Sequence, residues 1–152
     1  MQITQLYKIF ISDNASLSVK YAAEELKKYL NLICKSLDLD IICDETASSA
    51  PEIVIGSTYR TCTAAEKNDG SDSLYISAKN GSVYLCGSSE RAVIYAVYRF
   101  LEYIGCRFFS PDTEKIPSLD SIIIDDSLEI SEGSPFEYRD IYCSCAFDTD
   151  LS

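Results

Sequence analysis

The most informative absence from this chain is that of histidine. The sequence has 152 residues and no histidine among them, so no side chain has an unperturbed pKa near neutrality. This excludes Ser-His-Asp and Cys-His nucleophile pairs and the H-E-x-x-H zinc motif. Any catalysis by these residues would depend on carboxylates, tyrosine, lysine or cysteine.

Basic side chains are also scarce. The chain contains 13 Lys and Arg residues against 24 Asp and Glu residues, for a formal net charge of −11. An acidic surface repels phosphate backbones and anionic lipids. We therefore expect no nucleic acid and no membrane as a partner.

Long hydrophobic runs are missing as well. No apolar stretch approaches the roughly 18 residues of a membrane span, and the first residues lack the basic start and apolar stretch of a signal peptide. The sequence thus predicts a cytoplasmic protein. With 47% hydrophobic and 24% charged residues, its length and composition fit one globular domain.

Cysteines are numerous, but their pattern does not indicate a disulfide framework. They are odd in number, contain no C-x-x-C pair, and several lie in apolar stretches, which favours buried reduced thiols. The seven are Cys34, Cys43, Cys62, Cys86, Cys106, Cys143 and Cys145. Cys143 and Cys145 share one side of a strand, yet a zinc shell would need two further thiolates in a chain without histidine. We expect no metal site and no cofactor.

Hydrophobic periodicity predicts two long helices. Apolar residues recur every three or four positions from Ala22 to Leu37, and again from Val93 to Ile104. Ser88 or Ser89 is placed to cap the second helix at its start, and Gly105 is placed to end it.

Short apolar runs predict the strands. They cover residues 3–12, 39–43, 52–56, 74–79, 82–86, 106–109, 121–125 and 128–130. Asn80-Gly81 favours a type I′ hairpin turn between two of them. Residues 57–71, with a helical turn around positions 64–66, and residues 111–117 are predicted to be loops, the first of them the most mobile surface. The fold class is an α/β (α+β) sandwich with a mixed β-sheet and two main helices.

Candidate sites within the chain are few. Gly87 leads from a strand into a helix, but Ser89 stands where a dinucleotide-binding turn needs a second glycine, so a tight strand-to-helix turn is the better interpretation. No pair of carboxylates stands out for acid–base work, and we expect no catalytic residue here. Aromatic residues in and after the second helix fit either a sugar-stacking platform or core and interface packing.

One stretch resembles a known family. Residues 87–117, with Gly87-Ser-Ser-Glu-Arg91 and Gly105-Cys-Arg107, followed by Pro135-Phe-Glu-Tyr-Arg139, resemble the N-terminal domain of alpha-glucuronidase-like glycoside hydrolases. More distantly, the stretch is similar to the small α/β domain that precedes the barrel in beta-N-acetylhexosaminidases. Ala22-Ala-Glu-Glu-Leu-Lys-Lys-Tyr-Leu30 and Ile53-Val-Ile-Gly-Ser57 fit the same pattern.

The resemblance implies a zincin-like, hexosaminidase domain 2-like fold without a metal site. Residues 1–134 would form an accessory α/β domain, and residues 135–152 a linker and the first strand of a (β/α)8 barrel that carries the active site. The partners would then be that downstream barrel of the same chain and the glycan substrate of the parent enzyme. Arg139 matches an arginine that reaches the sugar in hexosaminidase-type relatives, which implies a substrate-binding role once the barrel is present.

These observations leave three functions open. The first is a non-catalytic N-terminal domain of a glycoside hydrolase, supporting a downstream catalytic barrel. The alternative is a free-standing carbohydrate- or protein-binding module that uses exposed tyrosines. The third is a thiol-dependent enzyme that uses one of the cysteines.

Overall fold

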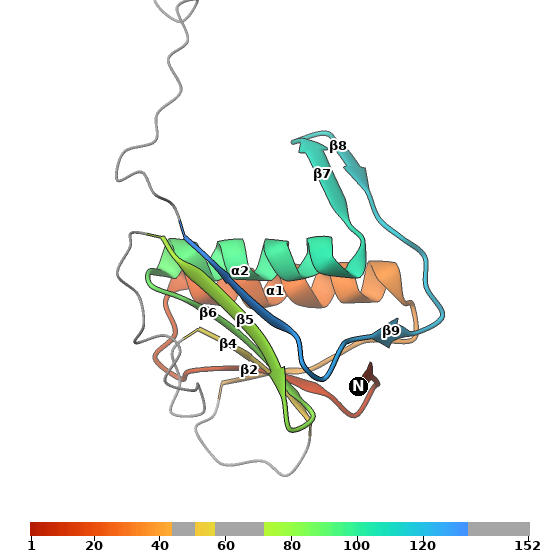
Figure 1. The fold of residues 1–152 in the computed structure, drawn as a ribbon, viewed down its shortest axis with the longest axis horizontal. Coiled ribbons are helices and arrows are strands. Elements are labelled where there is room, and N and C mark those ends of the chain that lie inside the picture. The colour runs from red at the N-terminus through yellow and green to blue at the C-terminus, as the bar shows by residue number, and fades with distance from the viewer. Residues whose placement is uncertain (44–50, 57–71, 134–152) are drawn as a thin grey trace, which may run out of the picture.

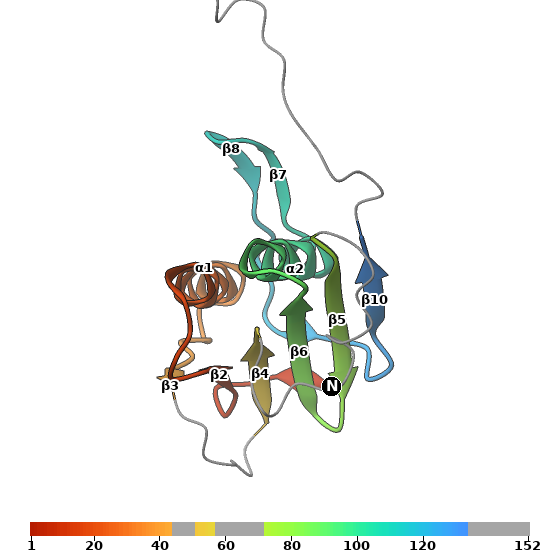
Figure 2. The same ribbon diagram turned by 90° about the vertical axis from the view of Figure 1, so that its left-hand side faces the viewer.

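The protein is a two-layer α/β domain in which two parallel helices cover one face of a mixed sheet (Figures 1 and 2). The computed structural model describes residues 1–43, 51–56 and 72–133. The helices are α1 (Leu17–Ile33) and α2 (Glu90–Ile104). This confirms the predicted fold class of a mixed sheet with two main helices.

The main sheet has six strands in the order β10-β5-β6-β4-β2-β3. Its strands are β2 (Lys8–Ile11), β3 (Ile41–Cys43), β4 (Glu52–Ile55), β5 (Leu74–Lys79), β6 (Ser82–Gly87) and β10 (Glu129–Glu132). The four strands β6, β4, β2 and β3 run parallel, while β5 pairs antiparallel with both β6 and β10. Both helices therefore start at the same edge of the sheet, where β2 and β6 end.

Two small sheets complete the described part of the chain. The first pairs β1 (Gln2–Ile3) with β9 (Ile122–Ile123), and the second is a hairpin of β7 (Arg107–Ser110) and β8 (Thr113–Lys115). The β7–β8 hairpin rises from the helix layer on the side that faces away from the sheet (Figure 2).

Local signals account for the second helix and for the β5–β6 hairpin. Ser89, one of the two serines predicted for the cap, caps α2, and Gly105 ends it in the left-handed region at φ 119°, as predicted. Between β5 and β6, Asn80 and Gly81 both have positive φ, 54° and 81°, as a type I′ turn requires.

The first helix lies earlier than its apolar spacing predicts. It begins at Leu17, because Ser16 accepts a hydrogen bond from the backbone N–H of Val19 and caps it. It ends at Ile33, since Cys34 is extended with φ −134°. Leu37, expected on the helix, lies beyond it but is still buried.

Two further predictions are wrong. Residues 3–12 do not form one strand, because a turn closed by the Tyr7 N–H and the Thr4 carbonyl (3.0 Å) separates β1 from β2. Residues 111–117 are not simply a loop, because Thr113 pairs with Ser110 across a two-residue turn and starts β8.

The cysteine prediction holds for three residues. Cys34, Cys86 and Cys106 are buried, whereas Cys43 is exposed because it ends the edge strand β3. Cys62, Cys143 and Cys145 lie outside the described residues, as do the predicted loop 57–71 and the segment 135–152. In the described ranges no helix is long and apolar enough to cross a membrane.

Candidate functional site

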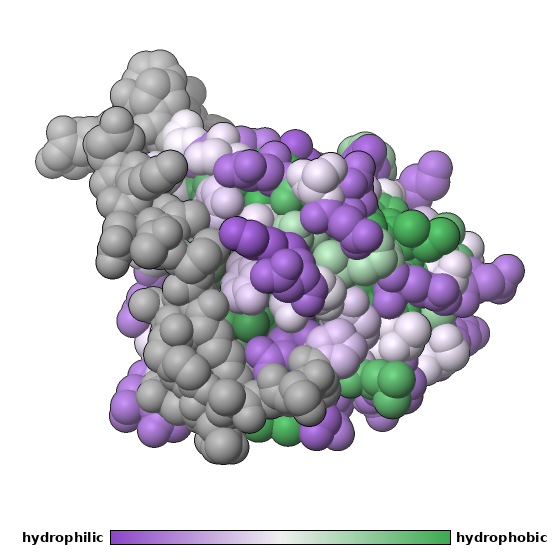
Figure 3. Space-filling view, turned by 60° about the horizontal axis from the view of Figure 1, so that its bottom comes forward, coloured by the Kyte–Doolittle hydropathy of each residue, from purple (hydrophilic) through white to green (hydrophobic). Residues whose placement is uncertain are grey.

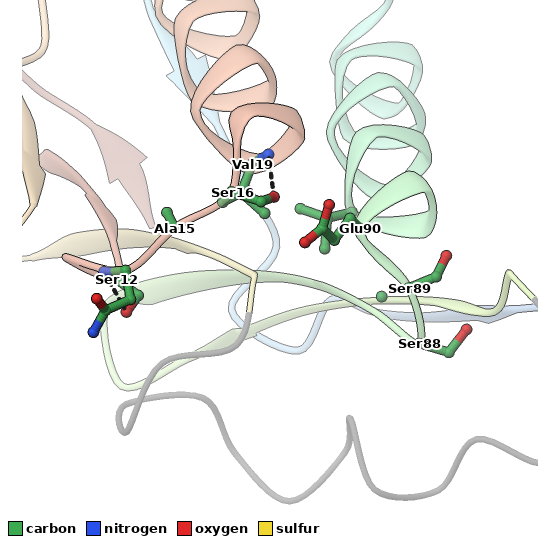
Figure 4. Close-up of a pocket in the computed structure, with 10 residues that line it drawn as sticks. Ser12, Ala15, Ser16, Val19, Ser88, Ser89 and Glu90 are labelled. Atoms are coloured by element: carbon green, nitrogen blue, oxygen red, sulfur yellow. Dashed lines mark hydrogen bonds between the residues drawn. The ribbon is translucent and has the colours of Figure 1, made fainter.

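A pocket of about 350 Å³ lies at the edge of the sheet where α1 and α2 begin, and we name it the serine pocket (Figure 4). The two strand-to-helix turns that follow β2 and β6 supply its walls. It is lined by Ser12, Asn14, Ala15, Ser16, Val19, Gly87, Ser88, Ser89, Glu90 and Val93. The carboxyl ends of parallel strands are a common place for ligands in α/β folds.

Gly87 allows the α2 side of the pocket to form. A Cβ atom at this position would lie 2.5 Å from the backbone carbon of Ala92 and from the backbone nitrogen of Val93. Because such contacts force the backbone to move, only glycine lets the first turn of α2 fold back over the end of β6. This agrees with the interpretation of a tight strand-to-helix turn.

The serine hydroxyls of the pocket mainly stabilise the turns that carry them. Ser16 Oγ accepts a hydrogen bond from the Val19 N–H (3.4 Å), and Ser89 Oγ accepts one from the Ala92 N–H (3.1 Å). Ser88 Oγ accepts a hydrogen bond from the backbone N–H at the residue before β5 (2.9 Å). The two helix caps satisfy backbone donors that a helix start leaves open.

A buried carboxylate ties the start of α2 to the start of β5. Asp72 has φ 57° and a side chain that is 4% exposed. It accepts a hydrogen bond from Ser89 Oγ (2.8 Å) and forms an ion pair with the Arg91 guanidinium. The hydrogen bond with Asp72 raises the pKa of Arg91. These two interactions hold the rim of the pocket in place and use both carboxylate oxygens of Asp72.

The chemistry of the serine pocket is neutral and polar, apart from one carboxylate. Glu90 is exposed in the first turn of α2, where it complements the helix dipole and opposes the entry of an anion. The lining contains hydroxyls, an amide and small apolar groups beside the Glu90 carboxylate. Such a lining suits hydrogen bonding to a small neutral molecule.

A second feature, at the other end of the helix pair, is a group of three aromatic rings that we name the aromatic cluster. Tyr29 of α1, Tyr98 of α2 and Phe108 of β7 contact one another edge to face, with centroids 5.0 to 6.2 Å apart. Edge-to-face packing of this kind stabilises a protein beyond the area that it buries. The cluster joins both helices to the β7–β8 hairpin.

Two carboxylates extend the aromatic cluster. The Tyr29 hydroxyl donates to Glu114 Oε2 of β8 (2.6 Å), and the Tyr98 hydroxyl donates to Glu25 Oε2 of α1 (2.7 Å). Burial, followed by these hydrogen bonds, raises the pKa of both tyrosines well above the usual value. Burial also raises the pKa of the nearby Cys106 thiol to about 11, with a contribution from Glu114. The tyrosines and this thiol therefore stay protonated near neutral pH, which does not suit them as bases or nucleophiles.

The predicted aromatic run thus divides into packing residues and surface residues. Phe100 is fully buried, and Tyr98 and Phe108 pack in the aromatic cluster. Tyr95 and Tyr103 are each 38% exposed, and Phe109 is 68% exposed. The exposed rings come from α2 and β7.

The site residues predicted from the sequence are only partly placed. Arg139 lies outside the described residues, as do Cys143 and Cys145. Within residues 1–43, 51–56 and 72–133 no group of three metal-ligating side chains could hold an ion. The sequence does not predict the aromatic cluster, because the apolar period from Ala22 to Leu37 places Tyr29 on the core face of a helix and Glu114 lies in a stretch predicted to be a loop.

The comparisons with known proteins connect this fold to a carbohydrate-active enzyme. No model of a known protein family matches the chain, and no curated protein is similar at a significant level. Among solved structures, the chain is similar to BtGH115A, a family GH115 4-O-methyl-alpha-glucuronidase with specificity for decorated arabinogalactans. The similarity has a TM-score of 0.59 at 13% identity and covers 87% of this chain and 18% of that chain. The chain therefore shares its fold with less than a fifth of the length of that enzyme.

Two further solved structures are similar at a lower level. A GH138 enzyme targeting pectin rhamnogalacturonan II gives a TM-score of 0.46 at 14% identity, over 83% of this chain and 15% of that one. CpGH84D gives a TM-score of 0.45 at 12% identity, over 63% of this chain and 17% of that one. These scores are too low to establish a shared fold.

Proposed function

We propose that this chain is the non-catalytic N-terminal domain of a glycoside hydrolase and supports a downstream catalytic barrel of the same polypeptide. The observation that carries the proposal is the similarity of fold between 87% of this chain and part of a GH115 alpha-glucuronidase. Fold alone does not specify function. The proposal is therefore also supported by the resemblance of residues 87–117 to the N-terminal domain of alpha-glucuronidase-like glycoside hydrolases.

The described side chains agree with an accessory role. The lining of the serine pocket holds a single carboxylate, and the aromatic cluster holds its tyrosines protonated. Glycoside hydrolysis needs two carboxyl groups placed on either side of the scissile bond. In this proposal the catalytic pair belongs to the barrel, and the hexosaminidase domain 2-like fold provides its support.

The same proposal gives Arg139 a role in substrate binding. Residues 135–152 form the linker and the first barrel strand, and Arg139 contacts the sugar once the barrel completes the site. Its partners are that barrel and the glycan, and we place the protein in the cytoplasm.

The test compares the 152-residue chain with the longer polypeptide read from the same reading frame. We expect the chain alone to release no 4-O-methylglucuronic acid from decorated arabinogalactan and no reducing sugar from a panel of aryl glycosides, while the longer polypeptide releases one of them. Turnover of any glycoside by residues 1–152 alone would contradict the proposal. In the longer polypeptide, Arg139→Ala should raise KM strongly, whereas Lys79→Ala at the exposed end of β5 should leave it unchanged.

A second candidate function is a free-standing carbohydrate-binding module, and the neutral polar lining of the serine pocket is the observation that favours it. Calorimetric titration of residues 1–152 with neutral oligosaccharides separates the two candidates. The accessory domain should give no heat of binding. Binding that disappears in Ala15→Phe, which fills the pocket, and persists in Leu6→Phe, on an exposed turn, would establish the second candidate.

A further inference from the structure

The turn between β5 and β6 carries a chemically reactive pair of residues. Asn80 is the one asparagine of the sequence that glycine follows, whereas Asn14, Asn31 and Asn68 precede alanine, leucine and aspartate. The backbone nitrogen of the next residue can attack the side-chain amide of an asparagine, and glycine hinders this approach least because it has no side chain. Both residues of the turn are exposed, and a Cβ atom at Gly81 would meet no other atom within 4 Å. Water therefore reaches the Asn80 amide.

The turn also lies on a hydrated side of the molecule. It points toward the bottom of Figure 1, and Figure 3 brings that side forward. Outside the grey atoms this side is mainly hydrophilic or intermediate, with hydrophobic residues in separate patches (Figure 3). The solvent water that the reaction consumes is thus at hand.

The reaction converts the Asn80 amide into an acid. The Gly81 nitrogen gives up its proton and bonds to Asn80 Cγ, the bond from Cγ to Nδ2 breaks, and ammonia leaves with that proton. Water then opens the five-membered succinimide at one of its two carbonyl carbons, which yields aspartate or isoaspartate. Nothing is oxidised or reduced. Either product adds a negative charge, and isoaspartate also adds a carbon atom to the main chain.

The folded turn blocks the ring closure. A five-membered ring needs the Asn80 Cβ and the Gly81 nitrogen on the same side of the bond between Cα and the carbonyl carbon. Asn80 has a φ of 54°, and left-handed backbone has a ψ of about +47°, which points these two atoms in nearly opposite directions. Asn80 must therefore leave the type I′ conformation before its side chain can react.

Two contacts hold the turn in that conformation. The first is the strand register, in which Lys79 pairs with Ser82 across the two turn residues. The second comes from Tyr7, 74 positions away, whose hydroxyl donates a hydrogen bond to the Gly81 carbonyl oxygen (2.9 Å). The Met1 Sδ lies farther from this hydroxyl (3.3 Å) and is a weaker acceptor. Tyr7 is only 5% exposed, so packing keeps its hydroxyl at the turn.

Tyr7 also keeps the proton that it donates. Burial, followed by the charge of Asp126, raises the pKa of Tyr7 above its ordinary value. The hydroxyl therefore remains a donor in mildly alkaline solution, where deamidation is fast enough to measure. Its contact with Gly81 persists under the conditions of the test.

We propose that Asn80 is a deamidation site and that the Tyr7 hydroxyl controls its reactivity by holding the β5–β6 turn closed. Modification takes place in the open turn, and isoaspartate, with its longer main chain, no longer fits a two-residue turn. The reaction thus records the opening of this hairpin as a permanent change of charge. It does not depend on the proposed function, because only the hairpin and Tyr7 take part.

The test follows the entry of heavy oxygen into the 152-residue chain. The folded protein is incubated in mildly alkaline buffer made with oxygen-enriched heavy water, moved to ordinary water and digested briefly with trypsin. We expect label in the peptide of residues 80–91, which lies between Lys79 and the bond after Arg91. The peptides that contain Asn14 and Asn31 should stay unlabelled over the same time.

Two tyrosine variants form a matched pair. Tyr7→Phe removes the hydroxyl at the turn, and Tyr98→Phe removes one in the helix layer that donates to Glu25 (2.7 Å). We expect residues 80–91 to acquire label about fivefold faster in Tyr7→Phe, the effect of one ordinary hydrogen bond on the population of the open turn. Tyr98→Phe should keep the wild-type rate. In concentrated urea all three chains should react at one faster rate, since no turn remains.

Each contrary result overturns a stated part of the proposal. The wild-type rate in a folded Tyr7→Phe, or equal acceleration in both variants, would overturn control by Tyr7, the second because global unfolding would then expose Asn80. Label in residues 80–91 in urea but in none of the folded proteins would overturn Asn80 as a site. The comparison of folded with urea-unfolded wild type needs no variant, and equal rates there would overturn protection by the turn.

Discussion

The two ends of the helix pair are built by different kinds of contact. Where α1 and α2 begin, Ser16 and Ser89 each bond to a backbone N–H three residues ahead. Near the other end, the Tyr29 hydroxyl donates a hydrogen bond to Glu114, and the Tyr98 hydroxyl donates one to Glu25. These pairs are 85 and 73 positions apart in the sequence. The first end is stabilised locally, whereas the second holds the β7–β8 hairpin through contacts that exist only in the folded domain.

The largest expected effect is at the helix starts. Gly87→Ala places a methyl group 2.5 Å from the backbone of α2, so we expect a loss of about 3 kcal/mol in the free energy of unfolding. Gly81→Ala is the control. Its φ of 81° is strained for alanine, but a Cβ atom there would meet no other atom within 4 Å, and we expect a loss of about 1 kcal/mol in the free energy of unfolding. Urea unfolding of both variants measures the difference. Equal losses would show that the start of α2 is not closely packed on β6.

The next effect tests the aromatic cluster. Phe108 is half-buried between Tyr29 and Tyr98, so Phe108→Ala should cost about 2 kcal/mol. Phe109 is the next residue on the same strand and is 68% exposed, and Phe109→Ala should change stability by less than about 0.5 kcal/mol. Hydrogen exchange at β8 should also accelerate in Phe108→Ala alone. Unchanged exchange there would mean that the ring does not hold the hairpin.

A smaller effect compares the two helix caps. Ser89→Ala removes both the cap of α2 and a hydrogen bond to the buried Asp72, and should cost about 1.5 kcal/mol. Ser16→Ala removes only a longer cap bond of 3.4 Å and should cost about 0.5 kcal/mol. Thermal and urea unfolding of the pair gives the ranking. A larger loss of stability in Ser16→Ala than in Ser89→Ala would show that the cap of α1 contributes more than the cap of α2.

The smallest effect is a dependence of stability on alkaline pH. The folded pKa of Cys106 is raised from 9.0 to about 11, so the folded state holds its thiol proton more tightly than the unfolded state. Its contribution is complete below pH 9.0 and is lost as the pH rises through about 11. Glu114→Gln removes one cause of the raised pKa, and urea unfolding between about pH 8 and 11 should then depend less on pH. The same slope in both proteins would exclude Glu114 as a contributor.

Part of the candidate site was accessible from the sequence. Gly87 and Ser89 could be assigned because a glycine after an apolar strand and a serine before a helical pattern act within a few residues. The serine pocket could not, since its other wall comes from Ser12 and Ser16 after β2. Only the parallel arrangement of β2, β4 and β6 brings the two turns together.

The sequence by itself determined the elements whose causes are local. These are the two amphipathic helices, the start of α2 at Ser88 or Ser89 and its end at Gly105, and the Asn80-Gly81 hairpin, because periodicity, capping and positive φ act over a few residues. The tertiary structure alone decided the pairing of β1 with β9, the β7–β8 hairpin and the exposure of Cys43. These depend on which distant segments become neighbours, and the energy that fixes them comes from buried contacts that no short stretch of sequence contains.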